Sequence, residues 1–413
     1  MKKVFLIFVL FIYLFNFEYV KAVDINKATN YNIFDTKLDL TSKNVILYNL
    51  KDNYMVYENG SNDKVKVASL TKIMTAIVGI ENIKNLDDKV TIDNKVFSGI
   101  SEYSKAGFKI GDKVTYRDLL YGIILPSGAD AVRALVLNVS GSEDKYVKIM
   151  NDKVKELKLN NTKFDNTIGM DSENNYSTAH DMAIILNYSL NNEEFRKIFT
   201  TKKYTVPSTN LVMYSTLNHY GMGIDVSMIE GAKSGFTDGA GVCLASIGMV
   251  NDIEYLLIVI GSDASNRSNA VKDSVYVYDF LKKNYEYKVL LKKNQEIKKI
   301  NVKWGKIKNY SLKSDNDLKI YVKNTVKDSD IEFVYDGIEE LNYRIKKGDK
   351  LGTVKIKYKD NILGKEDIYL DKDIKYYHPV IYTIIGISLL LMLLSLRSII
   401  RKKKRRKKKR KRK

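Results

Sequence analysis

The first strong pattern in the chain is a pair of apolar runs followed by an apolar stripe. Residues 45–48 and 54–57 flank a polar turn at 49–53, which predicts a β-hairpin. Beyond Ser69, the apolar positions recur at the spacing of one helix face: Leu70, Ile73, Met74, Ile77 and Val78. We therefore predict a buried helix that begins next to Ser69.

Similar patterns continue to about residue 283 and predict a domain of mixed class. Strands are expected at 242–250 and 253–260, joined by a tight turn. Pro126 ends a predicted helix and leaves Ser127 on the loop that follows. The segments with helical apolar spacing are 116–125, 129–139, 181–190 and 271–281. The expected fold is an α/β (α+β) domain over residues 23–283.

Short strands with one polar face are predicted beyond residue 286. Residues 318–322 and 354–358 alternate apolar and charged side chains, and turns rich in Gly or Asp separate such segments. One wet face and one dry face are typical of a small antiparallel sandwich. We expect this all-β domain to span residues 286–373 and to act as a spacer or docking module, because it carries no plausible catalytic cluster.

Both ends of the chain have patterns related to a membrane. Residues 1–22 begin with Met1-Lys2-Lys3, continue in an apolar run and end in small residues near Ala22, which predicts a secretory signal peptide. Residues 380–400 are apolar enough for a transmembrane helix, and residues 401–413 are all Lys or Arg. The positive-inside rule then predicts a single-pass protein of the cell membrane, with the basic tail in the cytoplasm and the preceding domains outside.

The net charge of +20 suggests a nucleic-acid partner, but 13 of these charges lie in residues 401–413. Such a tail is expected to orient the chain and to contact anionic lipid, and an outside location argues against nucleic acid. Cys243 has no second cysteine to pair with. The three histidines show neither zinc-site spacing nor a nucleophile elbow. We expect no metal and no cofactor.

Ser69 and Lys72 form the strongest candidate for chemistry. They lie one helical turn apart at a predicted helix N-terminus, where backbone N–H groups favour an oxyanion. Lys72 can take the serine proton if its pKa falls, and burial near Lys233 would lower that pKa. The same spacing occurs at Ser61 and Ser142, but neither follows a hairpin and begins an apolar helix. For an isolated string, an N-cap serine and a solvated lysine would be the better interpretation.

Two further motifs follow at long intervals, Ser127-Gly128 and Lys233-Ser234-Gly235. With them, the chain resembles the low-molecular-mass penicillin-binding proteins, the serine D-alanyl-D-alanine carboxypeptidases. The segments that carry the resemblance are 68–76, 125–131, 166–170, 176–182, 231–237 and 345–352. The resemblance implies a penicillin-binding, β-lactamase-like catalytic domain, a β domain and a C-terminal membrane anchor.

The resemblance also implies roles for individual residues. Ser69 would attack the bond between the terminal D-alanines of a peptidoglycan stem peptide, and Lys72 would accept its proton. Ser127, assisted by Lys233, would pass a proton to the leaving amine. The N–H groups of Ser69 and Phe236, the latter next to Gly235, would form the oxyanion hole. Side chains expected at the substrate carboxylate are Ser234 and Arg267, and β-lactams would acylate Ser69.

One departure from the family pattern leaves alternatives open. The second motif usually ends in Asn, and this chain has Ala129 there; Asp130 or Asn166 is a candidate substitute. A class A β-lactamase shares the nucleophile and lysines but needs Ser-Asp-Asn and a separate glutamate, and has no need of a β domain. A non-catalytic or weakly active cell-wall-binding protein, or a transpeptidase, is the other alternative.

Overall fold

The computed structural model describes residues 29–30, 37–51, 53–359, 361–377 and 379–410. The predicted signal peptide lies outside these residues. The chain divides into two compact units, residues 1–286 and 287–413, and each has its own cluster of buried apolar side chains.

The first unit is built on a six-stranded sheet. Its strands, in spatial order, are β1 (Thr29–Asn30), β3 (Tyr54–Asn59), β2 (Asn44–Asn49), β10 (Ile253–Ser262), β9 (Gly241–Val250) and β8 (Ile229–Thr237). The predicted hairpin is confirmed as β2 and β3, and the second predicted pair as β9 and β10. Asn251 and Asp252 take positive φ angles of 50° and 61°, as a tight hairpin turn between right-twisted strands requires. Strand β8 is left at the edge of the sheet.

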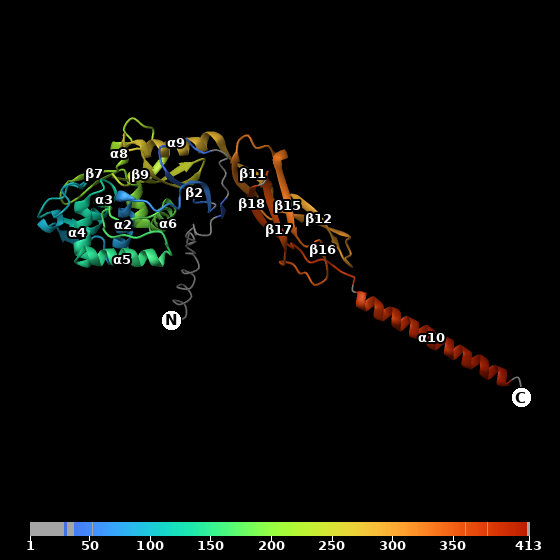
Figure 1. The fold of residues 1–413 in the computed structure, drawn as a ribbon. Helices are drawn as coiled ribbons and strands as arrows, with labels where there is room; N and C mark the ends of the chain where they lie inside the picture. Colours follow the sequence, from blue (N-terminus) through green and yellow to red (C-terminus); the bar gives the residue numbers. More distant parts are fainter. Residues whose placement is uncertain (1–28, 31–36, 52, 360, 378, 411–413) are drawn as a thin grey trace, which may run out of the picture. The chain divides into compact units, whose positions relative to one another are not determined.

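Helices cover both faces of this sheet (Figure 1). Helix α9 (Asn269–Asn284) packs on β9 and β10, and α6 (Ala179–Leu190) packs on β2 and β10 from the other side. The remaining helices are α2 (Thr71–Asn82), α3 (Tyr116–Ile124), α4 (Ala129–Ser140), α5 (Glu143–Glu156), α7 (Glu193–Thr200) and α8 (Leu217–Tyr220). Short elements complete the unit: β4 (Lys89–Thr91) with β5 (Lys113–Thr115), β6 (Lys203–Thr205) with β7 (Val212–Tyr214), η2 (Ala68–Leu70) and η3 (Asn94–Phe97).

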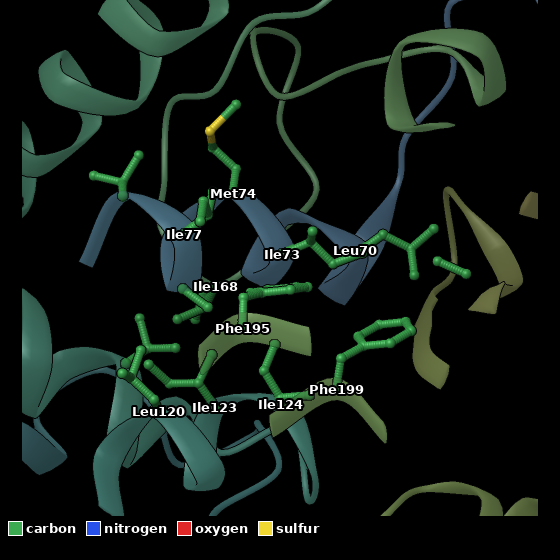
Figure 2. Close-up of a cluster of buried hydrophobic side chains, with 14 of the residues drawn as sticks. Leu70, Ile73, Met74, Ile77, Leu120, Ile123, Ile124, Ile168, Phe195 and Phe199 are labelled. Carbon is green, nitrogen blue, oxygen red and sulfur yellow. The ribbon is translucent and has the colours of Figure 1, made fainter. Parts of the chain in front are cut away.

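Helix α2 is the buried centre of this unit. Its apolar stripe packs against side chains of α3 and α7, as Figure 2 shows for Ile73, Ile124 and Phe195 among others. Helix α3 is fixed at its start by a capping box between Thr115 and Asp118. Because α2 is held on all sides, the residues at its N-terminus have a defined position, which matters for Ser69.

The second unit begins with an all-β domain. Its strands are β11 (Tyr285–Leu291), β12 (Glu296–Val302), β13 (Asn309–Lys313), β14 (Leu318–Lys323), β15 (Ile331–Gly337), β16 (Glu340–Leu341), β17 (Lys350–Tyr358) and β18 (Asn361–Tyr369), with one turn, η4 (Asp328–Asp330). They form three small sheets around one core. The predicted alternation is present in β17, where Val354 and Ile356 are fully buried and Lys355 and Lys357 are not.

Helix α10 (Pro379–Arg410) ends the described chain. By length and composition, its segment Val380–Arg405 is able to cross a membrane. The mixed α/β unit, the all-β domain and this apolar helix confirm the predicted fold class.

Candidate active site

Ser69 lies in the single turn η2, directly before α2, and Lys72 lies in the first turn of that helix. The Lys72 ammonium nitrogen is 2.8 Å from Ser69 Oγ and 2.7 Å from the carbonyl oxygen of Ile168. Lys72 is 2% exposed, whereas Ser69 is only half-buried. The serine is therefore accessible to a ligand, whereas the side chain of its lysine partner is shielded from solvent.

Two lysines share this buried region. Burial lowers the pKa of Lys72 to about 7. Burial also holds the pKa of Lys233 well below its usual value, and the charge of Lys72 lowers it further. Lys233 is fully buried and donates to the carbonyl oxygen of Ser234 at 2.7 Å. Since burial disfavours the charged form of Lys72, a neutral amine at this position is accessible near neutral pH.

Ser127 is presented by a strained turn between α3 and α4. Its φ angle is +64°, a left-handed conformation that costs energy in a residue with a Cβ atom. The next residue is Gly128, where a Cβ atom would lie 2.6 Å from the backbone nitrogen of Ala106. The neighbouring loop thus packs directly on this turn and fixes the direction of Ser127.

The edge strand β8 forms the opposite wall. Its Gly235 lies against η2, so that a Cβ atom there would be 3.0 Å from the backbone nitrogen of Ser69. Ser234 is 8% exposed, and the guanidinium of Arg267 lies over the ring of Phe236. The glycine allows the strand to approach the serine closely enough for both to contact one ligand.

A cavity of about 620 Å³ connects these elements. It brings together seven of the eight predicted site residues: Ser69, Lys72, Ser127, Ser234, Gly235, Phe236 and Arg267. Lys233 lies behind this surface, within electrostatic reach of Lys72. Sequence reasoning missed other parts of the wall, namely Tyr214 and Thr216 near β7 and α8, Tyr103, and His219, one of the three histidines.

Neither candidate substitute for the missing asparagine reaches this cavity. Ala129 is fully buried as the first residue of α4. The Asp130 carboxylate accepts the N–H groups of Ala106, Gly107 and Phe108, so it holds the adjacent loop and does not face the ligand space. Both side chains hold loops beside the site, and Asn166 also lines a recess that shares Tyr103 and Phe236 with the cavity. A role for either residue in place of the missing asparagine stays a prediction.

Residues 166–170, the Asn166 loop, contain Ile168, whose carbonyl oxygen accepts a hydrogen bond from Lys72. Asn166 Oδ1 accepts the N–H groups of Gly169 and Met170, at 2.7 and 2.9 Å, and the amide donates to the Met170 carbonyl. Gly169 has a φ of +87°, and a Cβ atom there would lie 2.0 Å from the Ala68 carbonyl oxygen. This loop therefore packs on η2 and presents the carbonyl of Ile168 to Lys72.

Within the described part of the chain, no three His, Cys, Asp or Glu side chains are grouped to hold a metal ion. The arrangement can instead support acyl transfer by a serine whose base is a buried amine. The half-buried hydroxyl, the amine with a lowered pKa and the edge strand beside them provide a nucleophile, a base and backbone donors.

Comparison with known proteins agrees with this geometry. Residues 31–264 match the family model described as peptidase S11, D-alanyl-D-alanine carboxypeptidase, and residues 285–376 match the C-terminal domain of penicillin-binding protein 5. The chain is 31% identical to the carboxypeptidase DacF of Bacillus subtilis, over 81% of this chain and 86% of DacF. It is 28% identical to DacA of Escherichia coli K12, over 76% of this chain and 79% of DacA.

Solved structures show the same likeness. Penicillin binding protein 5 from Haemophilus influenzae has a TM-score of 0.63 and 25% identity, and the match covers 82% of this chain and 99% of that protein. The Streptomyces K15 DD-transpeptidase has a TM-score of 0.54 and 28% identity, with 59% and 99% covered. Since the family model spans more than half of the sequence, the chain belongs to the peptidase S11 family of D-alanyl-D-alanine carboxypeptidases.

Proposed function

We propose that this carboxypeptidase removes the terminal D-alanine from peptidoglycan stem pentapeptides through an acyl-enzyme on Ser69. The observation that carries the proposal is the 2.8 Å contact between Ser69 Oγ and a buried Lys72 whose pKa is lowered to about 7. A neutral amine at that distance accepts the hydroxyl proton as the oxygen attacks. The carbonyl of Ile168 holds the amine in place at its other side.

In the proposed acylation, Ser69 Oγ bonds to the carbonyl carbon between the two D-alanines, and its proton passes to Lys72. The N–H groups of Ser69 and Phe236 stabilise the oxyanion, because η2 and the edge strand meet there. The C–N bond then breaks as Ser127 passes its hydroxyl proton to the departing amine and receives in turn the proton that Lys72 took from Ser69, which leaves both side chains as they began. Water cleaves the resulting ester, which frees the shortened peptide and restores Ser69.

The substrate carboxylate is proposed to lie along β8. Ser234 supplies a hydroxyl in the cavity, and Arg267 adds a positive charge above Phe236. Lys233 contributes from behind the strand, where it donates to the Ser234 carbonyl and where burial and the charge of Lys72 lower its pKa. A β-lactam presents the same carbonyl and carboxylate groups, so we expect it to acylate Ser69 as well.

A transfer reaction is the second candidate, favoured by the likeness to the Streptomyces DD-transpeptidase. In transfer, an amine replaces water as the acceptor of the acyl group. Ala129 is relevant to whether water or an amine accepts the acyl group, because the asparagine usual at this position in the family, and its amide, are missing. A carboxypeptidase and a transpeptidase form the same acyl-enzyme and differ only in the second step.

For the whole chain, we propose a protein of the cell membrane with its catalytic unit outside the cytoplasm. The proposal is supported by the apolar helix α10 and by the cell-wall role of the family. The proposed parts are a signal peptide (1–22), a catalytic domain (23–283), a β sandwich (286–373), a transmembrane helix (380–400) and a basic cytoplasmic tail (401–413).

The test is mass spectrometry of the products from a soluble stem pentapeptide, with and without an added amine acceptor. Release of D-alanine and a tetrapeptide supports the carboxypeptidase, whereas a tetrapeptide–amine adduct supports transfer. Ser69→Ala should remove both products and covalent penicillin labelling, a loss of about 10⁴-fold or more. Ser142→Ala is the matched control, because Ser142 has the same spacing to a lysine but only caps α5, and it should stay active. Full activity of Ser69→Ala would refute the mechanism.

A further inference from the structure

Residues 303–308, the Trp304 loop, join β12 to β13 in the β domain. Trp304 is 55% exposed and Ile307 is 43% exposed, although both are large apolar side chains. Trp304 takes a φ of +61°, a left-handed conformation that few bulky residues adopt. It is also the single tryptophan of the chain. Single exposed apolar residues are common on soluble proteins, so the surroundings of this one decide its meaning.

The Trp304 loop is tied by backbone contacts to the segment that leads into α10. The N–H of Tyr377 donates to the Trp304 carbonyl at 2.6 Å, and the N–H of Lys306 donates to the Lys375 carbonyl at 2.8 Å. Gly305 and Tyr376 form a β-bridge between them. Helix α10 begins at Pro379, two residues after Tyr377. At about 3.5 Å per residue, the loop therefore lies within roughly 10 Å of the start of that helix.

Aromatic side chains gather at this junction. Trp304, Tyr377 and Tyr382 line one open recess, and the rings of Tyr377 and Tyr382 are 6.2 Å apart. Tyr377 is 45% exposed and Tyr382 is 57% exposed. Tryptophan and tyrosine are enriched where a protein passes from lipid to water, because their rings have both apolar and hydrogen-bonding parts.

Lysines lie close to these aromatic residues along the chain. Lys306, Lys308 and Lys375 are all exposed, on both segments that the backbone contacts join. Lysines beside an interfacial aromatic group are suited to the phosphates of anionic lipid headgroups. Among the possible occupants of this surface, a lipid bilayer is favoured, since the adjoining helix is itself long and apolar enough to enter one.

We propose that the Trp304 loop lies in the headgroup region of the membrane and docks the β domain on an anionic lipid surface. The proposal rests on the membrane span proposed for α10. It adds a second contact to that anchor and fixes which end of the β domain faces the bilayer. A single helix joined by a short segment would leave the domain free to tilt, whereas a docked loop restricts that motion.

The lone tryptophan provides the test. The full chain is reconstituted into vesicles of phosphatidylglycerol and phosphatidylcholine, and the emission of Trp304 is recorded with lipids brominated near the headgroup or at mid-chain. We expect emission at shorter wavelength than in water, stronger quenching by bromine near the headgroup, and protection from aqueous acrylamide. Vesicle flotation is measured on the same samples. A chain that floats with an unquenched, acrylamide-accessible Trp304 overturns the docking alone, and a chain that does not float overturns the anchor as well.

Two sets of variants separate docking from anchoring. Trp304→Phe combined with Tyr276→Trp moves the probe to the 43% exposed position of Tyr276 on α9, which has no tie to the anchor. Quenching there as strong as at Trp304 would contradict a specific contact of the loop. Lys306→Gln with Lys308→Gln should lower Trp304 quenching about twofold in anionic vesicles and leave it unchanged in pure phosphatidylcholine. The same double variant should release D-alanine from a soluble pentapeptide at the native rate. If it is quenched as strongly as the native chain in anionic vesicles, the lysines do not contribute to docking.

Discussion

The catalytic unit and the β domain treat polar side chains in opposite ways. The first unit completely buries Lys233 and Asp130 and leaves Lys72 2% exposed. In the described part of the β domain, Ser314 is the one polar side chain that is buried, and lysines occupy the outward positions of strands such as β17. Burying an amine is costly because the charged form loses its hydration. The comparison indicates that the catalytic unit buries lysines despite this loss of stability because the proposed mechanism uses a base with a lowered pKa.

Replacing Lys233 tests this interpretation with the largest effect. Lys233→Met removes the buried amine but keeps its length, so we expect D-alanine release to fall by about 10²- to 10⁴-fold. The unfolded chain carries a charged, hydrated lysine that must lose its proton or its water on folding. The variant should therefore be as stable as the native protein or up to about 2 kcal/mol more stable in denaturant unfolding.

Lys355→Met in the β domain is the control, because Lys355 lies on the outer face of β17 and pairs with Asp336 at its surface. It should leave activity unchanged. An active Lys233→Met variant that is several kcal/mol less stable would mean that Lys233 serves packing and not catalysis.

The Asn166 loop offers a smaller and more specific test. Asn166→Ala removes three hydrogen bonds within the loop that presents the Ile168 carbonyl to Lys72. We expect kcat to fall about 10-fold, because the lysine is no longer held in position. The midpoint of the pH–rate profile should also move, which a loss of stability alone would not cause.

Asn151→Ala is the matched control. Asn151 exchanges hydrogen bonds with the backbone of Phe164, just before the Asn166 loop, but has no link to the carbonyl that Lys72 contacts. It should reduce stability by about 1–3 kcal/mol and leave the pH midpoint in place. Equal shifts of the midpoint in both variants would show that Asn166 has no special positioning role.

The smallest effects on activity are expected in the β domain. Ile356→Ala leaves a cavity in that core and should lower the unfolding free energy of the domain by about 2–5 kcal/mol. Lys355→Gln, one position away, should cost less than about 1 kcal/mol, since exposed ion pairs contribute little. Neither should change D-alanine release from a soluble pentapeptide. A tenfold loss of activity in Ile356→Ala would mean that the two units are functionally coupled.

The sequence was sufficient for the local features of the site. A hairpin followed by an apolar helical stripe located Ser69 and Lys72, and Pro126 indicated where Ser127 leaves its helix. The hairpin predicted at 242–260 indicated a strand at or next to Gly235, although the approach of this residue to Ser69 became visible only in three dimensions. These features depend on residues close together in the chain, and periodicity and breakers report such relationships directly.

Long-range contacts were not accessible from the sequence. The Ile168 carbonyl meets Lys72 across 96 positions, and Glu143 supports the same loop by accepting the N–H of Thr167. No local pattern encodes either contact. The same reason explains why the contacts of Asp130 with residues 106–108 were not predicted, since these three backbone partners lie more than 20 positions earlier. Helices α5 and α7 were also not predicted, although each buries apolar side chains at helical spacing, as Phe195, Ile198 and Phe199 do in α7.

The central claim is that Lys72 acts as a neutral base toward Ser69, and the pH dependence of acylation tests it most directly. The rate constant for penicillin acylation of Ser69 can be followed by rapid-quench mass spectrometry between pH 5 and 9. Because burial lowers the pKa of Lys72 to about 7, the amine is protonated below that pH and neutral above it. The rate constant should therefore rise with pH and level off, with a midpoint near 7. A rate constant that is flat over this range, or one that rises only toward the ordinary lysine value of 10.5, would contradict the account.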